Sequence, residues 1–183
     1  MRNLIKNLAV FAFVVLVVGC GYQPVSKITS QIMSKSVYVD VLMSKTDPQN
    51  TVAIKDAVKS GIVARLGSNL ADKSSAQTYI VASIKRLTFT ALTYDRYGYI
   101  TSYRANLTLN FKTKLKNGEI FSKDCVGDHD FSVSRLVKNK HDTISVISDK
   151  ERYDAIENAS TQAFDEFISA LAIKGIQLER AKN

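Results

Sequence analysis

One cluster of side chains could bind a metal ion or transfer protons, at Asp128, His129 and Asp130. It falls within an expected strand, where neighbouring residues point to opposite faces. Asp128 and Asp130 would then point one way and His129 the other, so the three cannot converge on one ion. The sequence also lacks a lipase-like Gly-x-Ser-x-Gly, a phosphate loop and a zinc-ligand spacing. We therefore expect no enzymatic activity and no bound metal.

The second reactive group is the thiol of Cys20, which ends the segment Val17-Val18-Gly19-Cys20. Basic residues precede an uncharged apolar run, which is shorter than the roughly 20 residues that span a bilayer. A charged start, a short apolar run and a small residue before the cut are typical of a signal peptide. The end of this segment resembles the lipobox of bacterial lipoproteins, whose cysteine receives diacylglycerol and an N-acyl chain. An ordinary signal or membrane anchor with an incidental cysteine is the alternative.

We therefore expect residues 1–19 to be removed and Cys20 to be the lipidation site, with no other cofactor. Two acyl chains anchor a protein stably, whereas one does so only marginally. The next residue is Gly21. In the lipoproteins that this segment resembles, Asp at that place favours retention in the inner membrane. We expect a lipid-anchored protein on the periplasmic side of the outer membrane.

The chain is basic, with 25 Lys and Arg against 17 Asp and Glu and a formal charge of +8. A basic balance favours acidic partners. For an exported chain these are anionic lipid or phosphorylated glycolipid, and not nucleic acid. With Cys20 acylated, Cys125 has no partner for an intrachain disulfide, and we interpret it as a small buried side chain.

The mature chain is long enough for one domain with its own core. Residues 20–36, with Pro24 and several Ser and Thr, are expected to form a lipidated tether. We expect a single α+β domain over 37–175 and a tail at 176–183. Strands are predicted at 37–42, 78–94, 99–115 and 120–133, and helices from Pro48 to about 66 and from Ser148 to about 174. The order β-α-β-β-β-α predicts a two-layer sandwich, in which a mixed four-stranded sheet carries both helices on one face.

The strand at 99–115 gives the clearest pattern, because apolar residues occupy its odd positions and polar residues its even positions. A three-residue loop with Gly118 left-handed would pair Leu109 with Cys125 and Tyr103 with Phe131. A two-residue Asn-Gly turn is the alternative, but it would bury more carboxylates. A loop of the same form at 96–98 would pair Leu87 with Leu107.

The lipobox with Cys20-Gly21-Tyr22, followed by a strand, a helix, a three-strand meander and a last helix, resembles the lipopolysaccharide-assembly lipoproteins of the LptE type. The resemblance runs from Cys20 to about Gly175. Val-Tyr-Val-Asp-Val at 37–41, Tyr-Arg-Ala-Asn-Leu at 103–107 and Ala-Phe-Asp-Glu-Phe-Ile at 163–168 are similar to a divergent branch. It implies a non-enzymatic protein that sits inside the outer-membrane barrel LptD, plugs it, and helps lipopolysaccharide to reach the outer leaflet.

Two sets of basic residues are candidates for contact with lipopolysaccharide phosphates, through charge-assisted hydrogen bonds. One set lies on the expected open sheet face and the other in an expected long loop at 134–147. The face set is Arg86, Arg104, Lys112 and Lys114, and the loop set is Arg135, Lys138 and Lys140. Simple solvation is the alternative for both. For the whole protein the alternatives are a lipoprotein that activates a cell-wall synthase and a lipid carrier with a hydrophobic cavity.

Overall fold

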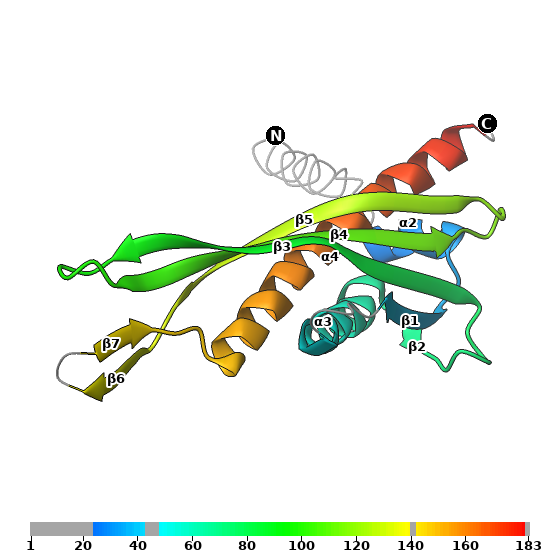
Figure 1. Cartoon of the computed structure of the whole chain (residues 1–183). Helices are drawn as coiled ribbons and strands as arrows, with labels where there is room; N and C mark the ends of the chain where they lie inside the picture. Colours follow the sequence, from blue (N-terminus) through cyan, green and yellow to red (C-terminus); the bar gives the residue numbers. More distant parts are fainter. Residues whose placement is uncertain (1–23, 43–47, 140–141, 182–183) are drawn as a thin grey trace, which may run out of the picture.

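The computed structural model describes residues 24–42, 48–139 and 142–181. Its main sheet has five strands in the order β2-β1-β3-β4-β5 (Figure 1). β1 runs parallel to both β2 and β3, whereas β4 is antiparallel to β3 and β5. The strands are β1 (Ser36–Leu42), β2 (Asn69–Leu70), β3 (Thr78–Tyr94), β4 (Ile100–Lys114) and β5 (Ile120–Ser132).

Three described helices and a small separate hairpin complete the fold. The helices are α2 (Val25–Ile32), α3 (Pro48–Leu66) and α4 (Asp149–Arg180), and the hairpin joins β6 (Arg135–Asn139) to β7 (Asp142–Ser145). The predicted α+β class and mixed sheet are confirmed. The predicted count of four strands and two helices is wrong, because it omitted α2, β2 and the β6–β7 hairpin.

Each omitted element is short. Within the expected tether, α2 spans eight residues and buries Thr29 and Ile32, and Met33 just beyond it enters the core. α2 is strongly amphipathic, but its Ser and Thr residues led to the prediction of a tether. β2 has two residues, too few to show any alternation. At the other end, α4 continues to Arg180 through most of the expected tail.

The predicted hairpin register is confirmed. Leu109 lies opposite Cys125, Tyr103 opposite Phe131, and Leu87 opposite Leu107. Gly98 and Gly118 both have positive φ, at 82° and 87°, which a glycine adopts without steric cost. These left-handed residues set the loop length, and the loop length fixes which side chains face the core.

The helices cover one face of the sheet, where the apolar residues of β4 are buried. Leu107, Leu109 and Phe111 are fully buried, and the Phe111 ring stacks on Phe167 with 4.8 Å between centroids. Phe164 meets Phe111 edge-on at 5.7 Å. The predicted division of β4 into a buried odd face and a wetter even face is therefore correct.

The predicted helix starts at Pro48 and Ser148 agree with the structure to within one residue, and local signals explain the ends. Ser148 forms a capping box with Glu151, in which each side chain accepts from the other residue's backbone N–H. Gly67 follows α3 with φ of 58°, a left-handed residue of the kind that commonly ends a helix. Pro48 begins α3 as predicted. Asp47, which precedes it, lies outside the described residues, as do Cys20 and residues 1–19.

Candidate interaction surface

The face of the sheet opposite the helices is uncovered and polar, and we refer to it as the open sheet face. It is formed by alternate residues of β3, β4 and β5. The central ones are Arg86, Thr88, Thr90, Arg104, Asn106, Thr108, Asn110, Lys112, Asp124, Asp128 and Asp130. Such a face suits a polar environment, either water or another polar surface.

Arg104 is held by two carboxylates across the β4–β5 pair. Its Nε and a terminal nitrogen donate to the two carboxylate oxygens of Asp130 at 2.6 and 2.8 Å, and Asp128 lies 3.8 Å from Nε. The hydrogen bond from Arg104 holds the pKa of Asp130 below its usual range. The charge of Arg104 is thus already matched within the protein, so it is a poor candidate for binding an external phosphate.

The same strand geometry shows that the side chains of the acid–histidine cluster at 128–130 do not converge on one point. Asp128 and Asp130 both lie on the open face beside Arg104, whereas His129 is opposite Ala105 on the other face. The predicted divergence of the three is confirmed. In the described ranges no three His, Cys, Asp or Glu side chains are grouped to hold a metal ion.

Polar side chains on the open face also bond to one another. Asn110 is 9% exposed, and its Nδ2 donates to Asp124 Oδ1 at 2.5 Å and to Ser122 Oγ at 3.2 Å. Asn106 Nδ2 donates to Thr90 Oγ1 at 3.2 Å. These cross-strand bonds fix the side chains of the face before any partner arrives.

Three cations of the predicted face set remain exposed: Arg86, Lys112 and Lys114. They have no hydrogen-bond or ion-pair partner within the described residues. Arg86 follows a bulge after Ile84, where the inserted residue moves the core face from even to odd positions. The structure therefore brings three of the four predicted cations to one face as free charges.

The second predicted set does not lie in a loop. Arg135 and Lys138 belong to β6, which pairs with β7, so the prediction of an irregular segment at 134–147 is wrong. Lys140 lies outside the described residues. A hairpin of two short strands without strong alternation gave no periodic signal in the sequence.

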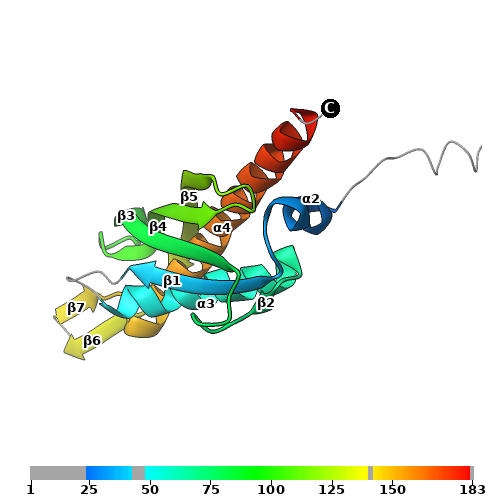
Figure 2. The same cartoon turned by 90° about the vertical axis from the view of Figure 1, so that its right-hand side faces the viewer.

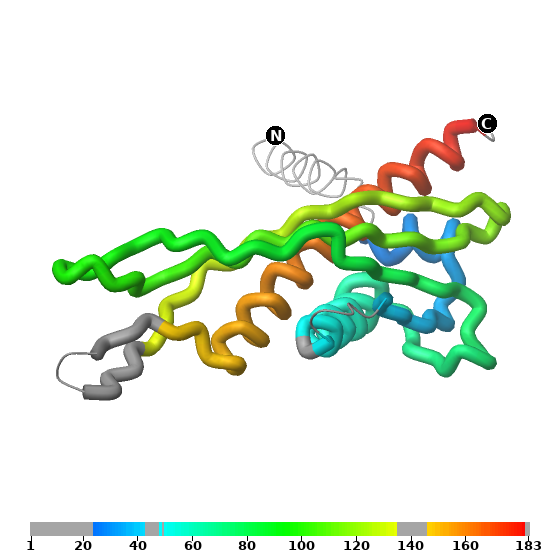
Figure 3. The backbone as a smooth tube through the Cα atoms, in the orientation of Figure 1, coloured from blue at the N-terminus to red at the C-terminus, as the bar shows by residue number. Residues whose placement is uncertain are grey.

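The β3–β4 hairpin extends beyond the helices, as Figure 1 and the tube in Figure 3 show. Arg152 of α4 lies over the Phe89 ring at 5.2 Å, and the hairpin continues past that contact. At its tip, Tyr94 and Tyr97 are 60% and 64% exposed, and the Arg96 guanidinium lies 4.6 Å from the Tyr97 ring centroid. Exposed tyrosines offer an apolar ring with a polar end, which suits an amphipathic partner. The loop at 96–98 was predicted from the sequence, but the exposed tyrosines at its tip were not.

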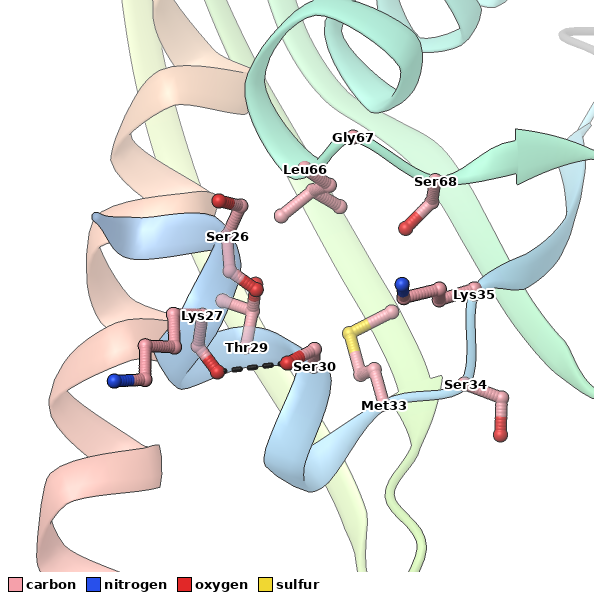
Figure 4. Close-up of a pocket in the computed structure, with 10 residues that line it drawn as sticks. All are labelled: Ser26, Lys27, Thr29, Ser30, Met33, Ser34, Lys35, Leu66, Gly67 and Ser68. Carbon is pink, nitrogen blue, oxygen red and sulfur yellow. Dashed lines mark hydrogen bonds between the residues drawn. The ribbon is translucent and has the colours of Figure 1, made fainter. Parts of the chain in front are cut away.

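A polar pocket of about 240 Å³ lies between α2 and the end of α3 (Figure 4). Lys35 points into it, whereas Lys27 points away. Ser30 Oγ donates to Lys27 O at 2.8 Å and Thr29 Oγ1 to Val25 O at 3.0 Å, so these hydroxyls are engaged by their own helix. The C-terminal ends of α2 and α3 both line the pocket, and an ammonium near a helix C-terminus is electrostatically favourable. We interpret the pocket as a junction between two helix ends.

Cys125 is fully buried on the core face of β5. Burial raises the pKa of its thiol to about 12, so the thiolate required for nucleophilic chemistry does not form at neutral pH. The prediction of a small buried side chain is confirmed. Within the described ranges, no helix is both long and apolar enough to cross a membrane.

Comparison with solved structures gives several lipoproteins at low identity. A putative lipoprotein from Caulobacter crescentus CB15 has 11% identity and a TM-score of 0.48, and covers 88% of this chain and 98% of its own. The rare lipoprotein B from Shewanella oneidensis has 13% identity and a TM-score of 0.45, covering 78% and 98%. A minor lipoprotein from Acinetobacter baumannii has 11% identity and a TM-score of 0.43, covering 78% and 94%.

No curated protein matches this sequence. The family model LptE, described as lipopolysaccharide-assembly, matches residues 34–171, which is most of the chain and nearly all of the described domain. The matched range includes the whole five-stranded sheet together with α3 and most of α4. This chain therefore belongs to the LptE family of lipopolysaccharide-assembly proteins.

Proposed function

We propose that this chain is an outer-membrane lipoprotein that plugs the lipopolysaccharide translocon barrel LptD, supports its assembly, and assists insertion of lipopolysaccharide into the outer leaflet. Membership of the LptE family, a non-enzymatic lipoprotein family, supports a role in lipopolysaccharide assembly. The barrel and the insertion step are our extension of that role.

The observation that carries the proposal is the open sheet face. A sheet with one uncovered face needs either water or a polar partner on that side, and the lumen of an outer-membrane barrel is polar. Here the face is fixed by its own bonds, from Arg104 to Asp130 and from Asn110 to Asp124. A rigid polar surface can meet a polar lumen without ordering its side chains on contact, which lowers the entropic cost of association.

The lipid anchor at Cys20 places the domain at the membrane in this proposal. Three residues separate Cys20 from Pro24, the first described residue. An extended chain spans at most about 3.6 Å per residue, so this link covers roughly 14 Å. The domain would therefore stay close to the periplasmic leaflet and beside a barrel embedded there.

The free cations Arg86, Lys112 and Lys114 are the proposed lipopolysaccharide contacts on this face, with Arg135, Lys138 and Lys140 as a second set. Exposed lysines and arginines bind phosphates as charge-assisted donors. Arg104 is left out because its two carboxylate partners already match its charge.

Photo-crosslinking in cells tests the proposal directly. A crosslinking amino acid is placed at Lys112 on the open face, with a matched position at Lys150 on the outer side of α4, where the native side chain is 83% exposed. We expect the Lys112 position to crosslink to the LptD barrel more strongly than the Lys150 position. Absence of a barrel adduct at both Lys112 and Arg86, with normal amounts of the lipoprotein, would contradict the proposal.

A further inference from the structure

The two edges of the main sheet differ in whether their outward backbone groups have hydrogen-bond partners. At the β5 edge, α4 supplies acceptors to the outward backbone groups. Val126 N donates to Glu166 Oε2 at 2.7 Å, and Asp128 N donates to Gln162 Oε1 at 3.1 Å. Closing an edge in this way prevents a further strand from pairing with it.

Among the described residues, the opposite edge is closed only at its beginning. β2 pairs with Ser36 and Val37 and then ends, and its last contact is the bond from Ala71 N to Val37 O at 2.9 Å. In a parallel ladder alternate residues direct both backbone groups to the same side. Val39 and Val41 therefore point their N–H and C=O groups to the side that β2 has left.

β1 bonds to β3 through its alternate residues Tyr38, Asp40 and Leu42. On the other side of β1, no residue in the described part of the chain bonds to the N–H and C=O groups of Val39 and Val41. Figure 2 shows β1 at this side of the sheet, with α3 next to it. Within the described residues, the edge of β1 from Val39 to Leu42 is thus available for pairing with a further strand, and α3 lies beside it.

A groove of about 530 Å³ lies where this free edge begins, at Val37–Val39. One wall is β1 at Val37–Val39, the other is the segment after β2, and α3 contributes Lys55 and Lys59. These two lysines are one helical turn apart and half-buried, and neither has an ion-pair partner among the described residues. Asp72 is the one acidic residue in the described lining, so the groove carries a net positive charge.

We infer that this groove binds an extended, acidic segment of a partner protein, which adds to the sheet as a strand beside β1. The segment's backbone would pair with the free groups of Val39 and Val41, as in strand addition to an exposed edge. Side chains alternate along a strand, so every second residue of the segment would face α3. Carboxylates at those positions would meet Lys55 and Lys59. This site is separate from the open sheet face and does not depend on the barrel proposal.

Amide hydrogen exchange on the mature lipoprotein in detergent micelles tests the free edge. Tyr38 and Asp40 are matched controls, because they lie on the same strand and their N–H groups face β3. We expect Val39 and Val41 to exchange at least about tenfold faster than these controls, as amides without a partner do. Equal protection of all four amides would overturn the inference.

A peptide probe tests the occupant. The probe has Glu at every second position with Thr and Val between, and the matched control peptide has Lys in place of Glu. The acidic peptide should slow exchange at Val39 and Val41 and leave Tyr38 and Asp40 unchanged, and the Lys peptide should have no effect. In the double variant Lys55→Glu/Lys59→Glu this preference should reverse.

Three results would contradict the assignment. One is an acidic peptide that leaves Val39 and Val41 unprotected. Another is protection that is indifferent to the Lys55→Glu/Lys59→Glu change. The third is protection that rises with protein concentration in the absence of peptide, because that would identify a second copy of this chain as the occupant.

Discussion

Gly127 of β5 lies directly against the backbone of Ala159 in α4. A Cβ at Gly127 would overlap the Ala159 carbonyl oxygen and would lie 2.8 Å from Ala163 N. The absence of a side chain lets α4 approach the edge strand closely enough for Glu166 and Gln162 to reach its backbone. One glycine thus allows both the packing of the last helix and the closure of the β5 edge.

Gly127→Ala should therefore destabilise the domain. The added methyl group must displace helix backbone, and overpacking of this kind costs about 1–3 kcal/mol. Gly127→Val should cost more than Gly127→Ala. The neighbouring Val126→Ala, at a side chain that is 58% exposed, is the control and should have little effect. Denaturant unfolding measures all three, and equal stability of Gly127→Ala and wild type would refute the close contact.

Truncation on the two faces of β4 should give opposite results. Leu109→Ala removes a fully buried side chain and should cost about 2–5 kcal/mol of unfolding free energy. Asn106→Ala loses two long hydrogen bonds, from Nδ2 to Thr90 Oγ1 at 3.2 Å and to Arg104 O at 3.4 Å, and should cost near zero. Urea denaturation of the two variants would show the reverse order only if the sheet were inverted.

The ion pair between Arg104 and Asp130 should make stability depend on pH in the acid range. Because the pKa of Asp130 is lowered in the folded state, its stabilising effect is present above the unfolded value of about 3.9. The effect is lost as the pH falls through the lower folded value. The difference in denaturation midpoint between wild type and Asp130→Asn should be present at pH 7 and vanish at strongly acidic pH.

The Arg104→Ala background is the control for that experiment. Without the guanidinium, Asp130→Asn should no longer change the pH dependence. Both groups are solvent-exposed, so the effect at pH 7 should be small and should weaken in high salt. A pH-dependent difference of unchanged size in the Arg104→Ala background would assign the shift to another residue.

Lipidation at Cys20 is tested by metabolic labelling with a fatty acid. Cys20→Ala removes the thiol that accepts the lipid, so the variant should carry no label and should be exported at best inefficiently. Cys125→Ala is the matched control and should be labelled like wild type, because its thiol is buried in the core. Equal labelling of the Cys20→Ala variant and wild type would exclude this anchor.

Alternation in β4 allowed the sequence to predict the sheet core, and the positions of Gly98 and Gly118 allowed it to predict the register. Those signals are local and strong, since one wrong step would reverse the face of every side chain. The same register implies that Arg104 faces Asp130, but Arg104 was predicted to be a free cation. Pairing of exposed charges depends on side-chain conformation, which no residue pattern specifies.

Two of the elements that escaped prediction, α2 and β2, are held by contacts distant in sequence. α2 packs closely on α4, where a Cβ at Gly175 would lie 2.9 Å from Ile28 Cγ2 and 3.6 Å from Ile32 Cδ1. β2 forms only because α3 returns the chain beside Ser36 and Val37. Short segments of this kind have little intrinsic preference, and tertiary packing decides their structure.

The central claim is tested most directly by depleting the lipoprotein from cells and measuring the amount of folded LptD barrel and of surface lipopolysaccharide. We predict that both fall on depletion, that wild type restores them, and that a variant carrying Lys112→Glu and Arg86→Glu on the open sheet face restores them less well than a matched Lys150→Glu variant. Normal barrel levels together with normal surface lipopolysaccharide after depletion would contradict the account.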